Sequence, residues 1–110
     1  MQPTALIFDM DGVLVDTLDY HFLAWQKVAE AGQIPFTRRD MDQLRGRSRQ
    51  DCLRCLFPGR ELSEAEIKAF FAIKDRQFSR SLRRMSARDI LPGVCRLLDE
   101  ARAANLRLAV

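Results

Sequence analysis

The spacing of apolar residues changes twice along this 110-residue chain. An apolar run, Ala5-Leu6-Ile7-Phe8, lies near the N-terminus, and residues 106–110, Leu-Arg-Leu-Ala-Val, end the chain. The first run predicts a strand that is buried on both faces, as in parallel sheets, and the last segment predicts a second strand. Between them, apolar residues recur at helical spacing, which predicts a helical segment between two strands.

Capping residues divide the helical segment. The first helix begins after Asp16 or Thr17, either of which can supply the N-cap, and Gly32 is the predicted stop. The next three helices begin at pairs with the spacing of N-terminal caps: Thr37 with Asp40, Ser48 with Asp51, and Ser63 with Glu66. After a turn at residues 91–93, one more amphipathic helix ends at Asn105 and leads into the second strand.

This order of elements predicts an α/β fold with an all-α insert of about four helices, within the usual boundary error of a few residues. We expect residues 1–16 and 89–110 to form the α/β core and residues 17–88 to form the insert. A helix that feeds a second strand is half of a right-handed crossover, so the strands should be parallel. Two strands and one helix cannot make a sheet covered on both faces, so we expect an N-terminal portion of a longer protein.

Composition narrows the classes of function. The chain is 47% hydrophobic and 30% charged, and no apolar run reaches membrane-spanning length. Acidic residues interrupt the first apolar stretch, unlike in a signal peptide, so we expect a cytoplasmic protein without membrane partners. The net charge of +3 comes from scattered arginines and does not favour nucleic-acid binding. Cys52 and Cys55 form a C-x-x-C within a helical pattern, which favours buried or half-buried thiols over a zinc or redox site.

The candidate chemistry lies directly after the first strand, at Asp9 and Asp11. Side chains two apart on an extended chain point the same way, and Gly12 allows the backbone to turn sharply. Two close carboxylates repel each other, and a divalent cation such as Mg²⁺ would compensate them. One carboxylate can then attack phosphorus while the other carries a proton. The short motif D-x-D-G by itself is equally consistent with an ordinary turn.

The longer motif Asp-Met-Asp-Gly-Val-Leu-Val-Asp-Thr, residues 9–17, resembles motif I of the haloacid dehalogenase-like superfamily. The resemblance implies a Rossmann-like core, of which only the first two parallel strands are present, with a helical cap inserted after motif I. It implies that Asp9 is the nucleophile and a Mg²⁺ ligand. It also implies that Asp11 is the general acid/base and gives the metal its backbone carbonyl. Asp16 and Thr17 would form the hinge between core and cap.

Within this superfamily, the insert resembles the cap of the β-phosphoglucomutase-like subclass. The resemblance implies a substrate-binding role for eight cap residues: His21, Trp25, Arg45, Gly46, Arg47, Ser48, Arg49 and Lys74. It implies interconversion of β-D-glucose 1-phosphate and glucose 6-phosphate through an aspartyl-phosphate, by a protein that is a monomer when complete.

The residues themselves leave other interpretations open. Arg47 can be solvated, Ser48 can be only an N-cap, Trp25 can be core, His21 can be structural, and Lys74 can extend along the edge of an apolar face. A sugar-phosphate or phosphoglycolate-type phosphatase with the same core is an alternative, because the two reactions differ only in whether a sugar hydroxyl or water attacks the phosphoenzyme. The remaining catalytic motifs of the family would lie beyond Val110, so we expect these 110 residues alone to be inactive, and a noncatalytic binding module stays open for them.

Overall fold

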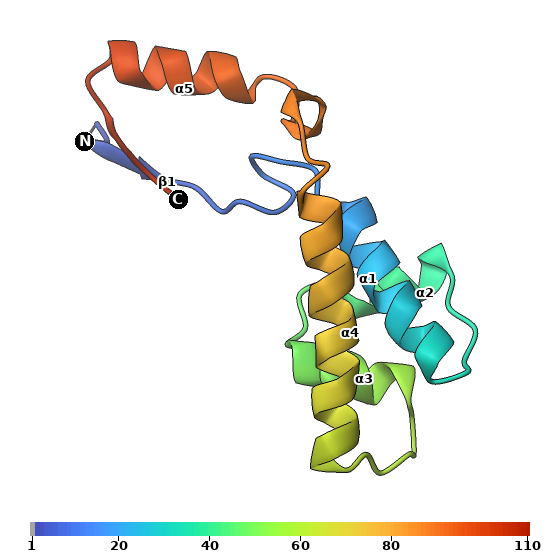
Figure 1. The fold of residues 1–110 in the computed structure, drawn as a ribbon. Helices are drawn as coiled ribbons and strands as arrows, with labels where there is room; N and C mark the ends of the chain where they lie inside the picture. Colours follow the sequence, from blue (N-terminus) through green and yellow to red (C-terminus); the bar gives the residue numbers. More distant parts are fainter. Residues whose placement is uncertain (1) are drawn as a thin grey trace. The chain divides into compact units, whose positions relative to one another are not determined.

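A computed structural model describes residues 2–110 (Figure 1). The chain forms two compact units. One comprises the chain up to Asp19 together with Arg84–Val110, and the other comprises Tyr20–Arg83. The fold is α/β, as the order of apolar patterns predicts, and the two units are described separately below.

The α/β unit contains two short strands, β1 (Ala5–Ile7) and β2 (Arg107–Ala109). They pair in parallel, with Leu6 opposite Leu108. Helix α5 (Val94–Ala103) precedes β2, and Asn105 ends this helix in the left-handed conformation with φ 58°. The predicted parallel crossover from helix to strand is confirmed, and so is the stop at Asn105.

The expected burial of the first strand on both faces is wrong for this chain. Ile7 is 83% exposed, and only Leu6 in β1 is half-buried. Burial on both faces requires layers on both sides of a sheet. Among the described residues, α5 is the only α-helix that lies wholly within the α/β unit, so helices can cover one face of the sheet at most.

The two chain segments that lead out of and back into the α/β unit are bonded to each other. The N–H of Asp16 donates to the carbonyl of Asp89 at 2.7 Å, and the N–H of Leu91 donates to the carbonyl of Leu14 at 3.0 Å. A 3₁₀-helix, η1 (Ala87–Asp89), precedes this pairing. The antiparallel pairing joins residues far apart in the chain and was therefore not expected from the sequence, whereas η1 is a local turn capped by Ser86 for which no helix was expected.

The helical unit is built from α1 (Leu18–Ala31), which starts at its edge, and from α2 (Arg38–Leu44), α3 (Arg49–Leu56) and α4 (Glu64–Leu82). The three predicted N-caps are confirmed: the side chains of Thr37, Ser48 and Ser63 accept from the N–H of Asp40, Asp51 and Glu66. Side chains from all four helices form one apolar core: Phe22, Trp25, Val28, Met41, Leu44, Cys52, Leu53, Leu56, Phe57 and Phe70. Because all four helices share this core, each holds its polar residues in a defined position.

The predicted stop at Gly32 is confirmed, although Gly32 is not the left-handed residue. Helix α1 ends at Ala31, and the left-handed residue that terminates it is Gln33, with φ 58°. The N–H of Ile34 donates to the carbonyl of Ala29, and the N–H of Gln33 to that of Glu30, as in a Schellman motif. Gly32 is small for another reason, because a Cβ there would overlap the ring of Phe57.

Cysteine burial matches the sequence-based expectation only in part. Cys52 is buried, and its thiol lies 3.5 Å from the carbonyl oxygen of Leu44, whereas Cys55 is exposed. Burial raises the pKa of the Cys52 thiol.

None of the helices within residues 2–110 is both long and apolar enough to cross a membrane.

Candidate active site

The loop after β1 is closed by its own backbone. The carbonyl of Met10 accepts from the N–H groups of Val13, Leu14 and Val15 at 3.2, 3.0 and 3.3 Å. Gly12 adopts a positive φ of 74°, which explains why glycine stands at this position. The turn fixes the direction of the two aspartates beside it.

Asp9 and Asp11 are both exposed at this turn. The Oδ1 of Asp9 accepts from the N–H of Met10 at 2.9 Å, while its Oδ2 has no protein partner among residues 2–110. The Oδ1 of Asp11 accepts from the hydroxyl of Thr17 at 2.6 Å, and Thr17 is buried, with only 2% exposed. One carboxylate oxygen of Asp9 is therefore bonded to the backbone at the start of the turn, and the other oxygen is available to a ligand.

The donor set is consistent with part of a magnesium shell. Mg²⁺ prefers oxygen ligands and keeps several waters and substrate phosphate oxygens, so one or two carboxylates are enough from one segment. Asp9 and Asp11 offer only oxygen. Among the described residues, His, Cys, Asp and Glu nowhere form a group of three or more that could hold a metal ion. A complete protein shell is thus absent from this part of the chain, while the residues expected to contribute to one are exposed.

The two expected hinge residues make different contacts. The Oδ1 of Asp16 accepts from the N–H of Leu18 at 3.3 Å, at the start of α1. The hydroxyl of Thr17, directly before α1, donates to Asp11. Asp16 therefore supplies a side-chain hydrogen bond at the start of α1, while Thr17 supplies one to the turn after β1.

Three of the expected substrate-binding residues meet in the helical unit, around Phe78. The ring of His21 stacks on that of Phe78, with centroids 4.4 Å apart. The Nζ of Lys74 lies 5.2 Å from the Trp25 ring and 5.3 Å from the Phe78 ring. Trp25 is 3% exposed and belongs to the core, so its core interpretation is confirmed. We call this group, His21, Trp25, Lys74 and Phe78, the aromatic cluster.

The loop at residues 45–49 is held mainly by local contacts. Arg45 pairs with Asp42 at 3.1 Å, and the Nε of Arg47 donates to the carbonyl of Gln43 at 2.7 Å. Gly46 has φ 72°, with open space where a Cβ would lie. The left-handed turn requires glycine here with or without a bound sugar.

Arg49 is the one residue of this loop with a long-range contact in the described chain. Its Nη2 lies 3.2 and 3.4 Å from the two carboxylate oxygens of Asp75, and its guanidinium carbon lies 4.0 Å from the Phe71 ring centroid. Along α4, Phe71, Lys74, Asp75 and Phe78 follow the spacing i, i+3, i+4, i+7. They therefore lie on one side of the helix.

The local sequence pattern does not mark Phe71, Asp75 or Phe78 as site residues. By sequence alone, Phe71 and Phe78 belong to an apolar stripe at helical spacing in α4. The sequence signal that could have marked Asp75 is its position on the helix, because it follows Lys74 directly and lies four residues after Phe71. Pairing with Arg49, 26 residues earlier, is not visible in any local pattern.

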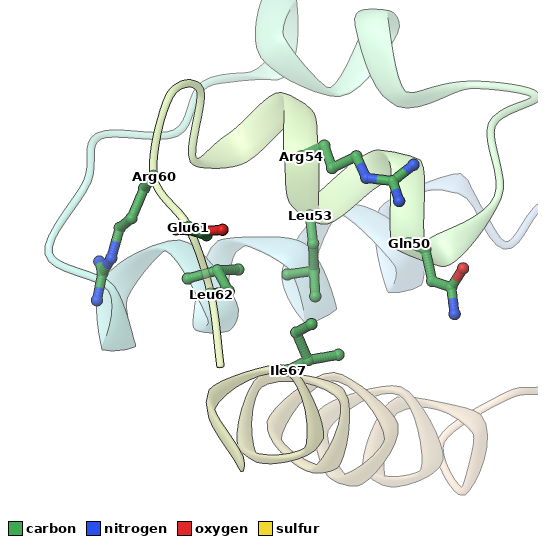
Figure 2. A pocket seen from close by; sticks show the side chains of 7 residues that line it. All are labelled: Gln50, Leu53, Arg54, Arg60, Glu61, Leu62 and Ile67. Atoms are coloured by element: carbon green, nitrogen blue, oxygen red, sulfur yellow. The ribbon is translucent and has the colours of Figure 1, made fainter. Parts of the chain in front are cut away.

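A pocket of about 380 Å³ lies elsewhere in the helical unit, between α3, α4 and the loop that joins them (Figure 2). Leu53, Leu62 and Ile67 point toward one another there, and Arg54 and Arg60 lie at the rim. Both arginines are already paired, Arg54 with Asp51 and Arg60 with Glu66. The polar residues at the rim have mixed charge, so the pocket does not define the charge of a ligand, and none of the expected site residues lines it.

Charge is divided unevenly between the units. Residues 20–83 contain 13 Lys or Arg and eight Asp or Glu, for a net charge of +5, and the remaining residues contain five and seven, for −2. A net positive unit attracts anionic small molecules such as phosphate esters.

The chain belongs to the haloacid dehalogenase-like hydrolases, since residues 3–110 match that family. Among curated proteins it is 37% identical to "Beta-phosphoglucomutase" of Bacillus subtilis, across 96% of this chain and 49% of that protein. It is 31% identical to "Phosphorylated carbohydrates phosphatase" of Thermotoga maritima, across 96% of this chain and 48% of that protein. The crystal structure of β-phosphoglucomutase from Clostridium difficile aligns with a TM-score of 0.85 at 30% identity, covering 97% of this chain and 50% of that one.

These matches confirm the superfamily that motif I suggested and the Rossmann-like core with a helical cap. The chain spans about half the length of the curated relatives that it matches. The relatives include both a mutase and a phosphatase, so membership of the family does not choose between the two reactions.

Proposed function

We propose that the protein carrying this sequence transfers phosphoryl groups through Asp9, and that it interconverts β-D-glucose 1-phosphate and glucose 6-phosphate. The observation that carries the proposal is the arrangement after β1. There Asp9 is exposed, with one carboxylate oxygen that has no protein partner within residues 2–110, and Thr17 holds the carboxylate of Asp11. The similarity to a β-phosphoglucomutase supports the choice of substrate.

In the proposed reaction, an oxygen of Asp9 attacks one phosphorus of a sugar bisphosphate, and the bond from that phosphorus to the sugar oxygen breaks. Asp11, protonated, gives its proton to the departing sugar oxygen, and a sugar monophosphate leaves. A hydroxyl of the other sugar monophosphate then attacks the phosphorus of the aspartyl-phosphate, Asp11 takes the proton of that hydroxyl, Asp9 is released, and the bisphosphate forms again. Bound Mg²⁺, held by the Asp9 carboxylate and the Asp11 carbonyl, would neutralise negative charge at the phosphate.

The cap residues supply binding in this proposal. Arg49 contacts the phosphate that is not transferred, since a guanidinium matches phosphate geometry. Lys74 and His21, which meet at Phe78, contact the sugar or the acid/base group. The remaining loop residues, Arg45, Gly46, Arg47 and Ser48, approach the substrate through their backbone.

A phosphatase is the second candidate, favoured by the similarity to a phosphorylated-carbohydrate phosphatase. In that reaction water replaces the sugar hydroxyl as the second nucleophile. Two cationic side chains favour the mutase: Lys74 in the aromatic cluster and Arg49 over the Phe71 ring. Both can bind parts of a large polar substrate other than the transferred phosphate.

The test uses the full-length protein that contains this sequence. Isomerisation of β-D-glucose 1-phosphate and release of inorganic phosphate are measured in parallel, with and without Mg²⁺. We expect isomerisation to exceed release, and Asp9→Asn to lower both by about 10³-fold or more, because the nucleophile is lost. The matched control is Asp99→Asn, an exposed aspartate on α5 of the same unit, which should leave turnover unchanged.

Fast phosphate release from many esters without isomerisation would replace the mutase by the phosphatase. Full activity of Asp9→Asn would contradict both. Residues 1–110 alone should give no turnover. Phosphoryl transfer needs positive charge placed around the transferred phosphate, and the α/β unit that contains Asp9 has a net charge of −2. A cytoplasmic location for the whole protein is part of the same proposal.

A further inference from the structure

Arg49 is held by two groups that act on it in different ways. Asp75 contacts only its Nη2, at 3.2 and 3.4 Å, so the Nε and Nη1 groups have no protein partner within residues 2–110. The guanidinium carbon lies over the face of the Phe71 ring, 4.0 Å from its centroid. The stack does not occupy the N–H groups, which lie in the guanidinium plane, and therefore leaves them available to an anion.

The contact with Asp75 is of a kind that a phosphate can replace. The side chains of Arg49 and Asp75 are 47% and 59% exposed, and exposed ion pairs contribute little to stability. A phosphate group carries more charge than a carboxylate and accepts from two guanidinium N–H groups at once. Phe71 can keep the guanidinium in place during this exchange, because its contact does not depend on which anion is bound.

We propose that Asp75 is an internal competitor for the anion-binding site at Arg49, and that it sets how tightly the protein binds the phosphate that is not transferred. Phe71 is the positioning residue that holds Arg49 while one anion replaces the other. The inference rests on the proposed function, since it takes Arg49 as a phosphate-binding residue. It adds to that function, because it assigns control of the affinity for phosphate to Asp75, which contacts Arg49 from α4.

The test is Asp75→Asn in the full-length protein, which removes the charge and keeps an oxygen that can accept from Arg49. We expect the KM for glucose 6-phosphate and the inhibition constant for inorganic phosphate to fall about two- to fivefold, the size of effect that one exposed charge exerts. The kcat should change less than about twofold, because the reacting atoms are untouched. Phe71→Leu should raise the same KM.

Two controls separate a competitor from a structural ion pair. Glu30→Gln breaks another exposed pair, with Lys27 on α1, and should leave the KM unchanged. In an Arg49→Gln background, Asp75→Asn should have no further effect on the KM, since the competitor then has nothing to compete for. Circular dichroism and thermal unfolding confirm that each variant is folded.

The failure of this inference can be told apart from the failure of the proposed function. If Arg49→Gln raises the KM but Asp75→Asn leaves it unchanged or raises it, Asp75 is no competitor and the role of Arg49 stands. If Arg49→Gln leaves the KM for glucose 6-phosphate unchanged, Arg49 does not bind substrate phosphate, and both the inference and that part of the function are overturned.

Discussion

The hydroxyl of Thr17 donates a hydrogen bond of 2.6 Å to the carboxylate of Asp11, six residues earlier in the chain. Thr17 is buried and directly precedes α1, while Asp11 lies in the exposed turn after β1. The bond therefore joins the expected hinge to the expected general acid/base, and the orientation of Asp11 depends on the position of the hinge residue.

We expect Thr17→Val to lower kcat by about tenfold with little change in KM, because a hydrogen bond to a charged group contributes about 1.5–3 kcal/mol. Valine has nearly the same shape, so the packing around position 17 is kept. Thr17→Ser restores the hydroxyl and should restore most of the rate. The measurement is steady-state kinetics of the full-length protein, and a Thr17→Val variant that is as fast as the wild type would show that this bond does not serve catalysis.

Ser48 can be tested for two roles at once. Its side chain accepts from the N–H of Asp51 at 3.1 Å and caps α3, so Ser48→Ala should cost about 1 kcal/mol of stability. Ser48→Asp keeps the cap and should keep the stability, but it places a negative charge next to Arg49. We expect this variant to raise the KM for a phosphorylated substrate. Urea unfolding and kinetics give the two results separately, and an unchanged KM would leave Ser48 with the capping role alone.

Acid should weaken the helical unit through its capping boxes. Hydrogen bonds from the backbone N–H of Thr37 and of Ser63 lower the pKa of Asp40 and of Glu66 from their ordinary values of 3.8 and 4.5. A carboxyl group whose pKa is lower in the folded state stabilises that state at pH values above its ordinary pKa. This stabilisation is lost as the pH falls through the lowered pKa of the folded protein.

The check compares wild type with Glu66→Gln in urea unfolding between about pH 7 and pH 2, a range that spans the titration of carboxyl groups. The variant should be less stable at neutral pH, and the difference should shrink as the pH falls below about 4.5, the ordinary value for this carboxyl group. The control is Glu64→Gln, which lies in the same first turn of α4 but outside the capping box. A difference that stays constant with pH would contradict the assignment.

Much of the fold could be predicted from the sequence because its signals are local. The cap of α4, for example, needs only Ser63 and Glu66 three residues later, and the structure contains both of its hydrogen bonds. The parallel pairing of β1 with β2 follows from the helical crossover that connects the two strands. The exposure of Ile7 could not be predicted in this way, because an apolar run does not reveal how many layers cover it.

The candidate site was predictable in its residue types and less so in its contacts. The motif that begins at Asp9 was recognisable as a whole, since its nine residues are contiguous. The partner of Arg49 was not, because Asp75 lies on another helix and an aspartate among many charged residues gives no signal. The assignment of sugar-binding roles to the cap residues stays a prediction, whereas the local contacts that compete with those roles are now defined.

The end of α1 provides a test of how packing and backbone conformation act on two adjacent residues. Gly32 lies against the ring of Phe57, where a Cβ would overlap it, whereas Gln33 has the left-handed φ of 58°. The left-handed conformation is unfavourable for a residue with a Cβ, so Gln33→Gly should stabilise the protein by about 0.5–1 kcal/mol. Gly32→Ala should destabilise it by about 1–3 kcal/mol, because added volume in a packed core forces side chains to shift.

The double variant Gly32→Ala/Phe57→Leu decides between the two causes. If the cost of Gly32→Ala comes from the Phe57 ring, that substitution should cost less in the Phe57→Leu background than in the wild type. If Gly32 were required for backbone freedom, the cost would be the same in both backgrounds. Thermal unfolding of the four variants of this cycle, with Gln33→Gly measured alongside, gives the answer, and a stabilising Gly32→Ala would overturn the packing assignment.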